Sequence, residues 1–262
     1  METVAELISP QGEKIDLSGL PDYQRITADM VDTAPEFVPI YLQAVKFTMT
    51  SAQNMFALYS AVKYIAETGI GGDIVECGVW RGGSCMIAAL TLQSVQKDSR
   101  RKIWLYDTFS GMPAPTAVDQ PIGVGRAAIR QDPLKIWRKE RVDDRRSNWC
   151  YASLDDVRQN LRGTGYPAER IEFVAGKVEE TIPARMPGAI ACLRLDTDWY
   201  ESTYHELTHL YPLLAPGGVL LLDDYGFWEG QKKAVDRYFG EQDIKLFLHR
   251  VDANARLAIK TR

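Results

Sequence analysis

Acidic residues stand where four of the apolar runs in the sequence end. Glu76 ends the first of these runs, Asp107 the second, Asp196 the fourth and Asp223 the fifth. If the runs are parallel strands, their carboxyl ends share one edge of a sheet, which is where open α/β folds bind ligands. One such acid alone could equally cap a helix or face solvent. Four together predict a functional site at this edge.

Two acidic segments, Asp196-Thr-Asp-Trp-Tyr and Asp223-Asp-Tyr-Gly, suggest a metal site. We expect Asp196, Asp223 and Asp224 to converge from neighbouring strand ends. Carboxylates crowded in this way repel one another unless a cation lies between them. An all-oxygen ligand set favours Mg²⁺, Mn²⁺ or Ca²⁺ over zinc. The alternative is that Asp224 only caps the helix that follows.

A glycine-containing turn follows the first strand, in the segment Glu76-Cys-Gly-Val-Trp-Arg-Gly-Gly-Ser. Gly78 allows a tight turn beside a ligand, and Gly82 and Gly83 allow a helix to approach the sheet closely. The segment has neither the Gly-Lys-Ser/Thr ending of a phosphate loop nor the dinucleotide spacing Gly-x-Gly-x-x-Gly. Glu76 suits an ammonium group, such as that of S-adenosylmethionine, and Asp107 suits ribose hydroxyls.

Asp198 follows Asp196 by two residues and is our candidate general base. In an extended chain both side chains point the same way, so Asp198 would lie beside the metal. An alcohol has a pKa far above neutral, and therefore needs a metal to lower it and a base to take its proton. A sulfonium methyl donor then requires little beyond in-line positioning.

A second segment matches the sequence of a metal-binding motif, but its context argues against metal binding. His205-Glu-Leu-Thr-His209 reads as the His-Glu-x-x-His of zinc proteases. No third ligand follows at a suitable spacing, and the predicted helix crosses between two buried strands. The chain also lacks the Gly-x-Ser-x-Gly turn of serine hydrolases. Both observations argue against a hydrolase.

These residues are expected to be positioned by a doubly wound α/β sheet of seven strands, mostly parallel. Five apolar runs alternate with helical segments, and several are apolar on both faces, as in a parallel sheet covered on both sides. The chain closes with a hairpin around Asp252-Ala-Asn, which predicts one antiparallel strand at the edge. The five runs cover residues 73–77, 102–107, 170–176, 190–196 and 218–223.

Two further segments are expected to cover the site within a single domain of residues 1–262. The first 35 residues are rich in breakers, and a helical pattern runs from Pro39 to Thr68 with Ser51 as an N-cap. We therefore expect residues 1–68 to form a helical extension. Residues 111–148 lie in a long connection with several prolines and glycines, which predicts a mobile lid.

Composition excludes several classes of partner. The net charge of -4 and pI of about 5.5 argue against nucleic acid. The basic stretch of residues 135–146 contains three acids, which predicts a solvated, charge-mixed helix and loop. The sequence contains no run of eighteen apolar residues, so no membrane-spanning helix is predicted. The N-terminus does not resemble a signal peptide, and four cysteines without a Cys-x-x-Cys pair indicate reduced thiols, so we expect a cytoplasmic protein.

Four segments together resemble the macrocin O-methyltransferase family, and the resemblance covers about residues 40–262. It implies a fold of the class I methyltransferase type, S-adenosylmethionine, Mg²⁺ and a homodimer. It also implies methylation of a deoxysugar hydroxyl on a glycosylated antibiotic. The 4-hydroxyl of noviose in novobiocin biosynthesis is the expected acceptor, with a macrolide-type sugar as the alternative. The segments are residues 73–83, 106–113, 195–203 and 217–225.

The resemblance also implies roles for particular residues. The metal would be held by Asp196, Asp223 and Asp224, with Asp198 as the base. Residues 49–51 would form a lid together with the 111–148 segment. The cofactor would be held by Glu76, Gly78, Ser84, Asp107, Thr108 and Asp196, with Gly176 and Lys177 near its adenine.

Two other functions remain as alternatives. A nicotinamide oxidoreductase can use the same kind of sheet, although the glycine spacing speaks against it. A non-catalytic binding protein can keep the fold, although crowded carboxylates would then serve no purpose.

Overall fold

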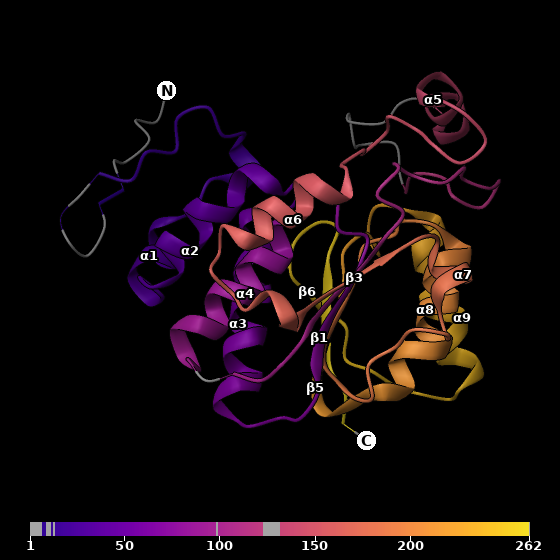
Figure 1. Ribbon diagram of the computed structural model, residues 1–262. Coiled ribbons are helices and arrows are strands. Elements are labelled where there is room, and N and C mark those ends of the chain that lie inside the picture. Colours follow the sequence, from indigo (N-terminus) through magenta and orange to yellow (C-terminus); the bar gives the residue numbers. More distant parts are fainter. Residues whose placement is uncertain (1–6, 9–11, 13, 98, 123–131, 262) are drawn as a thin grey trace.

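The computed structural model describes residues 7, 8, 12, 14–97, 99–122 and 132–261. A seven-stranded sheet runs through this part of the chain in the order β3-β2-β1-β4-β5-β7-β6. Helices cover both faces of the sheet (Figure 1). The predicted fold class, a mostly parallel and doubly wound α/β sheet, is confirmed.

Five parallel strands form the centre of the sheet and two antiparallel strands extend it. Every residue of β4 is buried, because helices pack on both of its faces. The strands are β1 (Asp73–Cys77), β2 (Ile103–Asp107), β3 (Ile171–Ala175), β4 (Ile190–Leu195), β5 (Leu214–Leu222), β6 (His249–Arg250) and β7 (Arg256–Ile259).

The closing hairpin differs in one respect from the expectation. Both of its strands join the sheet, with β7 antiparallel to β5 and the two-residue β6 at the edge. Strand β5 also begins at Leu214, earlier than the predicted start at residue 218. The preceding helix ends at Leu210, and Pro212 lies in a short 3-10 turn. Proline disfavours continuation of an α-helix, so the strand begins early.

One face of the sheet is covered by the N-terminal helices α1 (Ala28–Thr33), α2 (Phe37–Ala44) and α3 (Ala52–Glu67), together with α4 (Gly83–Val95) and α6 (Leu154–Arg162) (Figure 1). Helix α1 lies within the stretch expected to be irregular. Ser51 caps α3 as predicted, since its Oγ accepts a hydrogen bond from the Asn54 N–H at 3.1 Å. The apolar faces of α2, α3 and α4 form one buried cluster against the sheet.

The other face is covered by α7 (Val178–Thr181), α8 (Tyr200–Leu210) and α9 (Glu229–Glu241) (Figure 1). Their buried residues form a second cluster with the opposite side of the strands. No helix among the described residues is long and apolar enough to cross a membrane.

The 111–148 segment contains α5 (Pro133–Glu140), which overlaps the stretch 135–146 that was predicted to form a charge-mixed helix and loop. Asp132 caps this helix and Pro133 occupies its first turn, a combination that favours a helix start. The segment is tied to the body where Trp137 Nε1 donates to the Met112 carbonyl at 3.0 Å. Residues 123–131 of the predicted lid lie outside the described residues.

Candidate active site

A cavity of about 760 Å³ opens at the carboxyl ends of β1, β2, β4 and β5. Residues 47–54, which lead into α3 and form its first turn, make another part of the cavity wall. The turn of the C-terminal hairpin, residues 251–254, makes a third part. Of the residues predicted from the sequence, the cavity is lined by Gly78, Ser84, Asp107, Thr108, Gly176, Lys177, Asp196, Asp198, Asp223 and Asp224. The predicted edge of the sheet is therefore the place where these residues meet.

The glycine turn after β1 brings the backbone close to the end of β4. Gly78 has a φ of +81°, and a Cβ added there would overlap the carbonyl oxygen of Asp196. Any other residue would be both strained and in collision. The turn is held by Asp107, whose carboxylate accepts hydrogen bonds from the N–H groups of Val79 at 2.7 Å and Phe109 at 2.7 Å. Glycine here lets the turn after β1 pack directly against the end of β4 at the edge of the cavity.

Asp107 has a structural role that the sequence did not reveal. Its carboxylate also accepts from the Trp80 N–H at 3.1 Å, so several backbone donors already converge on it. Burial raises the pKa of this carboxyl group, against the opposing effect of those hydrogen bonds. It still borders the cavity. The predicted contact with ribose hydroxyls remains a prediction.

Glu76 lies beneath the cavity and not on its lining. Its side chain is buried, and its carboxylate accepts from Arg194 Nη1 at 2.5 Å and from Cys85 Sγ at 2.8 Å. Strand β1 continues to Cys77, so the pleat directs Glu76 toward α4 and away from the edge of the sheet. This position favours a role in holding Arg194 over the predicted contact with an ammonium group.

Three carboxylates meet at the edge of the sheet. Oxygen atoms of Asp196, Asp198 and Asp224 lie within 4.8 Å of one another. Burial, followed by neighbouring carboxylates, raises the pKa of Asp198 to about 7. Burial likewise raises the pKa values of Asp196 and Asp224 well above the usual range. The raised pKa values show that three carboxylates this close together are unfavourable as anions unless a positive charge joins them. An all-oxygen group of this kind fits a divalent cation such as Mg²⁺.

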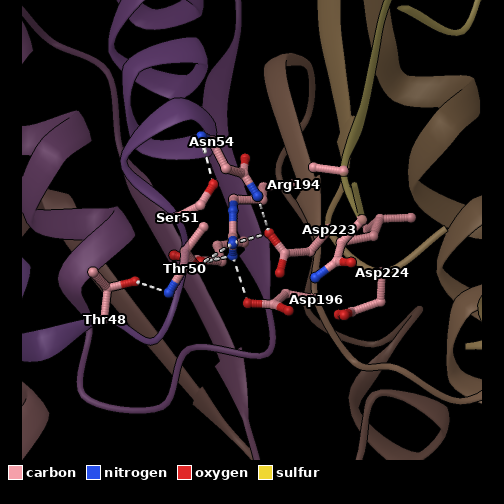
Figure 2. A network of polar contacts seen from close by, with 12 residues as sticks. Thr48, Thr50, Ser51, Asn54, Arg194, Asp196, Asp223 and Asp224 are labelled. Carbon is pink, nitrogen blue, oxygen red and sulfur yellow. Dashed lines mark hydrogen bonds and ion pairs between the residues drawn. The ribbon is translucent and has the colours of Figure 1, made fainter. Parts of the chain in front are cut away.

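This group differs from the predicted metal set in one member. Asp198 joins it, whereas Asp223 turns one oxygen toward Arg194 and accepts from Asn54 Nδ2 at 2.5 Å (Figure 2). The sequence interpretation assumed an extended chain through residue 198. Asp198 instead has a φ of +66°, a left-handed conformation that few residues other than glycine adopt. That turn directs its carboxylate toward the other two.

Arg194 is a central residue of the site that sequence analysis missed. It is the last but one residue of β4 and is buried, and Figure 2 shows its guanidinium among the carboxylates at the strand ends. Nη1 contacts Asp196 Oδ2 at 2.7 Å, in addition to Glu76, and Nη2 contacts Asp223 and Thr50. An arginine inside the otherwise apolar run Ile-Ala-Cys-Leu-Arg-Leu was the signal that could have revealed it.

Glu206 is a second buried acid that the sequence did not identify as functional. It lies on α8 with no exposed surface, and it accepts a hydrogen bond from Thr197 Oγ1 at 3.1 Å. Thr197 joins Asp196 to Asp198, so Glu206 supports the turn that carries both. Burial raises the pKa of Glu206 well above its usual value. The neutral acid is therefore the form that fits this position.

The two histidines of the His-Glu-x-x-His motif do not form a metal site. His205 Nε2 lies 3.0 Å from the Ile182 carbonyl oxygen, and the His205 and His209 rings are 4.5 Å apart. In the part of the chain that the structure describes, the only group of three potential metal ligands is the one formed by aspartates.

An aromatic wall lies beside the carboxylates. The Trp149 and Trp199 ring centroids are 5.7 Å apart, and those of Trp199 and Trp228 are 5.1 Å apart. Trp199 and Trp228 are both buried, and Trp199 donates from Nε1 to the Pro113 carbonyl at 3.1 Å. Trp149 and Trp228 line the cavity. Sugars and aromatic ligands both offer apolar faces that pack on such rings.

Comparison with known proteins agrees with this geometry. The family model described as macrocin O-methyltransferase (TylF) matches residues 39–258. The chain is 32% identical over 216 residues to demethyldecarbamoylnovobiocin O-methyltransferase of Streptomyces niveus, covering 82% of this chain and 76% of that protein. It is 30% identical to 8-demethyl-8-(2,3-dimethoxy-alpha-L-rhamnosyl)-tetracenomycin-C 4'-O-methyltransferase of Streptomyces olivaceus, covering 84% and 78% of the two chains.

Solved structures give the same result. The chain matches the structure of the O-methyltransferase NovP with a TM-score of 0.68 and 30% identity, over 82% of this chain and 83% of that one. It matches the calicheamicin methyltransferase CalS11 with a TM-score of 0.61 at 19% identity, over 90% and 86%, which shows a shared fold.

Proposed function

The chain belongs to the macrocin O-methyltransferase family, and from that premise we propose that it transfers a methyl group from S-adenosylmethionine to a sugar hydroxyl, with the help of a divalent cation. The observation that carries the proposal is the group of Asp196, Asp198 and Asp224, which borders the same cavity as the glycine turn. A methyl donor and an acceptor hydroxyl held in that cavity would lie next to these carboxylates. The proposed cation is Mg²⁺.

The donor half of the cavity is proposed to be the side of β1, β2 and β3. Gly78 lets the turn after β1 pass directly against the backbone of Asp196, and Ser84 lies in the first turn of α4; both line the cavity. Asp107 and Thr108 border the same side and would receive the ribose. Gly176 and Lys177 follow β3 and would lie near the adenine. This arrangement follows the rule that ligands of open α/β sheets bind beyond the carboxyl ends of the strands.

The acidic half would prepare the acceptor hydroxyl. Asp196 and Asp224 would hold the cation, and Asp223 would add a ligand through the oxygen that does not contact Arg194. A bound divalent cation supplies the positive charge that lowers the pKa of an alcohol. Asp198 would accept the hydroxyl proton on a carboxylate oxygen as the C–O bond forms and the S–CH₃ bond breaks. The chain's further contribution is in-line positioning in a partly enclosed cavity.

The acceptor is proposed to be a glycosylated small molecule, and the 4-hydroxyl of noviose is our first candidate. The similarity to the demethyldecarbamoylnovobiocin enzyme supports this choice. Trp149 and Trp228 support a glycoside more generally, since they offer apolar surface beside the acidic group. Relatives also act on a rhamnosyl tetracenomycin and on mycinamicin III, so these acceptors are the alternatives to test.

Methyl transfer from labelled S-adenosylmethionine tests the proposal. The purified chain would be incubated with demethyldecarbamoylnovobiocin, with Mg²⁺ in one arm and EDTA in the other. We expect transfer that EDTA abolishes and that added Mg²⁺ restores. Transfer that is equally fast in EDTA would contradict the metal role. If the methyl group is transferred only to the rhamnosyl or macrolide acceptor, that sugar replaces noviose as the proposed acceptor. The proposed cofactor and cation would then stand.

The proposal includes a homodimer that works in the cytoplasm. The four cysteines are free, as expected for a reducing compartment. Light scattering after size exclusion would show a particle of about twice the 29.5 kDa chain mass. A particle of one chain mass at assay concentrations would contradict the dimer.

A further inference from the structure

Arg194 is unusual because it is a charged residue in the middle of the sheet. Its exposed fraction is 1%, and its neighbours in β4 are apolar and buried. Placing a guanidinium in such an environment is costly unless charges and hydrogen bonds compensate for the lost water. The contacts of Arg194 must therefore be strong, and they decide what this residue does.

The partners of Arg194 come from separate parts of the chain. Glu76 belongs to β1, Asp196 follows β4, Asp223 follows β5 and Thr50 precedes α3. A guanidinium presents several N–H donors in a fixed plane, so it can hold several oxygens at set angles. Arg194 thus fixes the ends of three strands relative to one another.

These contacts divide the acidic residues into two groups. Arg194 engages Glu76, Asp223 and the Oδ2 atom of Asp196. The group that fits a cation is formed by Asp196 together with Asp198 and Asp224. Asp196 belongs to both groups, so the orientation of its carboxylate is set by the arginine on one side.

The same contacts reach the wall of the cavity. Thr50 Oγ1 lies 3.1 Å from Arg194 Nη2, and Asn54 Nδ2 donates to the Asp223 oxygen that Arg194 also contacts (Figure 2). Both residues line the cavity. The position of this wall is therefore fixed by the residues that orient Asp196.

We propose that Arg194 is a positioning residue: it holds Asp196 and Asp223 so that a single cation site forms, and it sets the 47–54 wall against that site. The inference rests on the proposed function, since the cation is part of it. It assigns a purpose to a buried charge that does not itself line the cavity.

A simple counter-charge would behave in the opposite way. A positive charge that only neutralised the acids would compete with a metal ion, so weakening its contacts would leave cation affinity unchanged or higher. A positioning residue orients the ligands, so changing it should lower cation affinity. Replacement of residues that orient metal ligands typically costs about 10–100-fold in affinity.

The test is Mn²⁺ binding to the full chain, measured from the electron paramagnetic resonance signal of the free ion. Arg194→Lys keeps the charge but loses the planar fork. We expect its Kd for Mn²⁺ to rise at least about tenfold. We also expect excess Mg²⁺ to restore much of its methyl transfer. A Kd for Mn²⁺ that is unchanged or lower in a folded Arg194→Lys protein would overturn the inference.

Arg101→Lys is the matched control. Arg101 is a half-buried arginine that donates to the carbonyl oxygens of Gly72 and Ile65, before the first strand and far from the carboxyl ends. Its replacement should lower the thermal unfolding temperature without changing Mn²⁺ affinity. Equal loss of affinity in both variants would mean that general destabilisation, and not positioning, explains the effect.

Thr50→Val provides a second variant if Arg194→Lys does not fold. It removes one hydrogen bond to Nη2 and keeps the side-chain shape. We expect a smaller rise in the Mn²⁺ Kd, and no change would overturn the link between the wall and the site.

If the wild-type chain binds S-adenosylmethionine but no Mn²⁺, the proposed metal site and this inference both fail. Mn²⁺ binding that depends on Arg194 without methyl transfer would keep the inference and reject only the proposed acceptor.

Discussion

Asp198 has a left-handed backbone and a carboxylate held near two others. Its φ of +66° costs free energy, and such conformations gather at functional sites. The residue type and its distance from Asp196 along the chain were readable from the sequence. Its backbone conformation was not, because the Thr197 turn depends on the buried Glu206 of a later helix.

Asp198→Asn tests the base. Asparagine keeps the shape of the side chain but does not accept the proton, so kcat should fall by about 10²–10⁴. Affinity for S-adenosylmethionine should stay unchanged, because a base acts mainly in the transition state. Single-turnover rates and calorimetric binding measure the two quantities. A variant that turns over at the wild-type rate would remove Asp198 from the mechanism.

Glu206 makes stability depend on pH. Burial raises its folded pKa well above the unfolded value, so its contribution is fully present below the unfolded pKa. That contribution is lost as pH rises through the folded pKa. Glu206→Gln stays neutral at every pH, and Gln can accept from Thr197 in the same way. The variant should therefore gain unfolding temperature over the wild type as pH rises from about 5 to 8.

Thermal unfolding of both proteins across that pH range measures the Glu206 effect. A change of about 1 kcal/mol in the free energy of unfolding shifts the unfolding temperature by about 2–4 °C for a chain of this size. Glu206→Leu, which cannot accept from Thr197, is the control and should lose activity that Glu206→Gln keeps. If the difference in unfolding temperature between wild type and Glu206→Gln is the same at all pH values, Glu206 is not protonated in the folded protein as proposed.

At the scale of elements, hydrophobic patterning identified the parallel strands and most of the helices between them. The predicted bounds of the first strand, residues 73–77, are those of β1. The direction of Glu76 was nevertheless not foreseen: Glu76 lies inside the strand, so its side chain follows the pleat. The pairing of Glu76 with Arg194 joins residues 118 apart in the sequence. Local patterns carry no information on such a contact.

The 111–148 segment remains a predicted lid, and proteolysis can test it. Its exposed arginines include Arg141, Arg145 and Arg146, which are sites for trypsin. Met112 and Pro113, at its start, line the cavity. Closure over donor and acceptor would slow cleavage here while leaving cleavage at the exposed Arg158 of α6 unchanged. Equal rates with and without ligands would mean that the segment does not close.

At the scale of the whole molecule, the fold and the family were both predictable. The alternation of strands and helices gave the sheet, and four short segments gave the family, whose model matches residues 39–258. The arrangement of charges inside the sheet was not predictable, since Arg194 and its partners meet only after the strands have paired.

Divalent cations should stabilise the whole chain, and more so at high pH. The folded pKa of Asp198 is raised to about 7, so without a cation its contribution to stability is lost as pH rises from about 4 to 7. A ligand at 100 times its Kd adds about 2.7 kcal/mol to the free energy of unfolding, which raises the unfolding temperature of this chain by about 5–10 °C. We expect the Mg²⁺-dependent rise in unfolding temperature to be larger at pH 8 than at pH 5.5. A rise of the same size at both values would contradict this explanation.

The bond between Ser51 and Asp252 has a consequence for the order in which the protein is assembled. Ser51 Oγ donates to Asp252 Oδ2 at 2.5 Å, across 201 residues of chain, and both residues line the cavity. Contacts between such distant residues form late in folding, because the loop between them must be closed first. A partly folded chain could therefore have its central strands paired and still lack a complete binding site. During refolding, ligand binding should appear after the helical signal has recovered, and it would report the last step of folding.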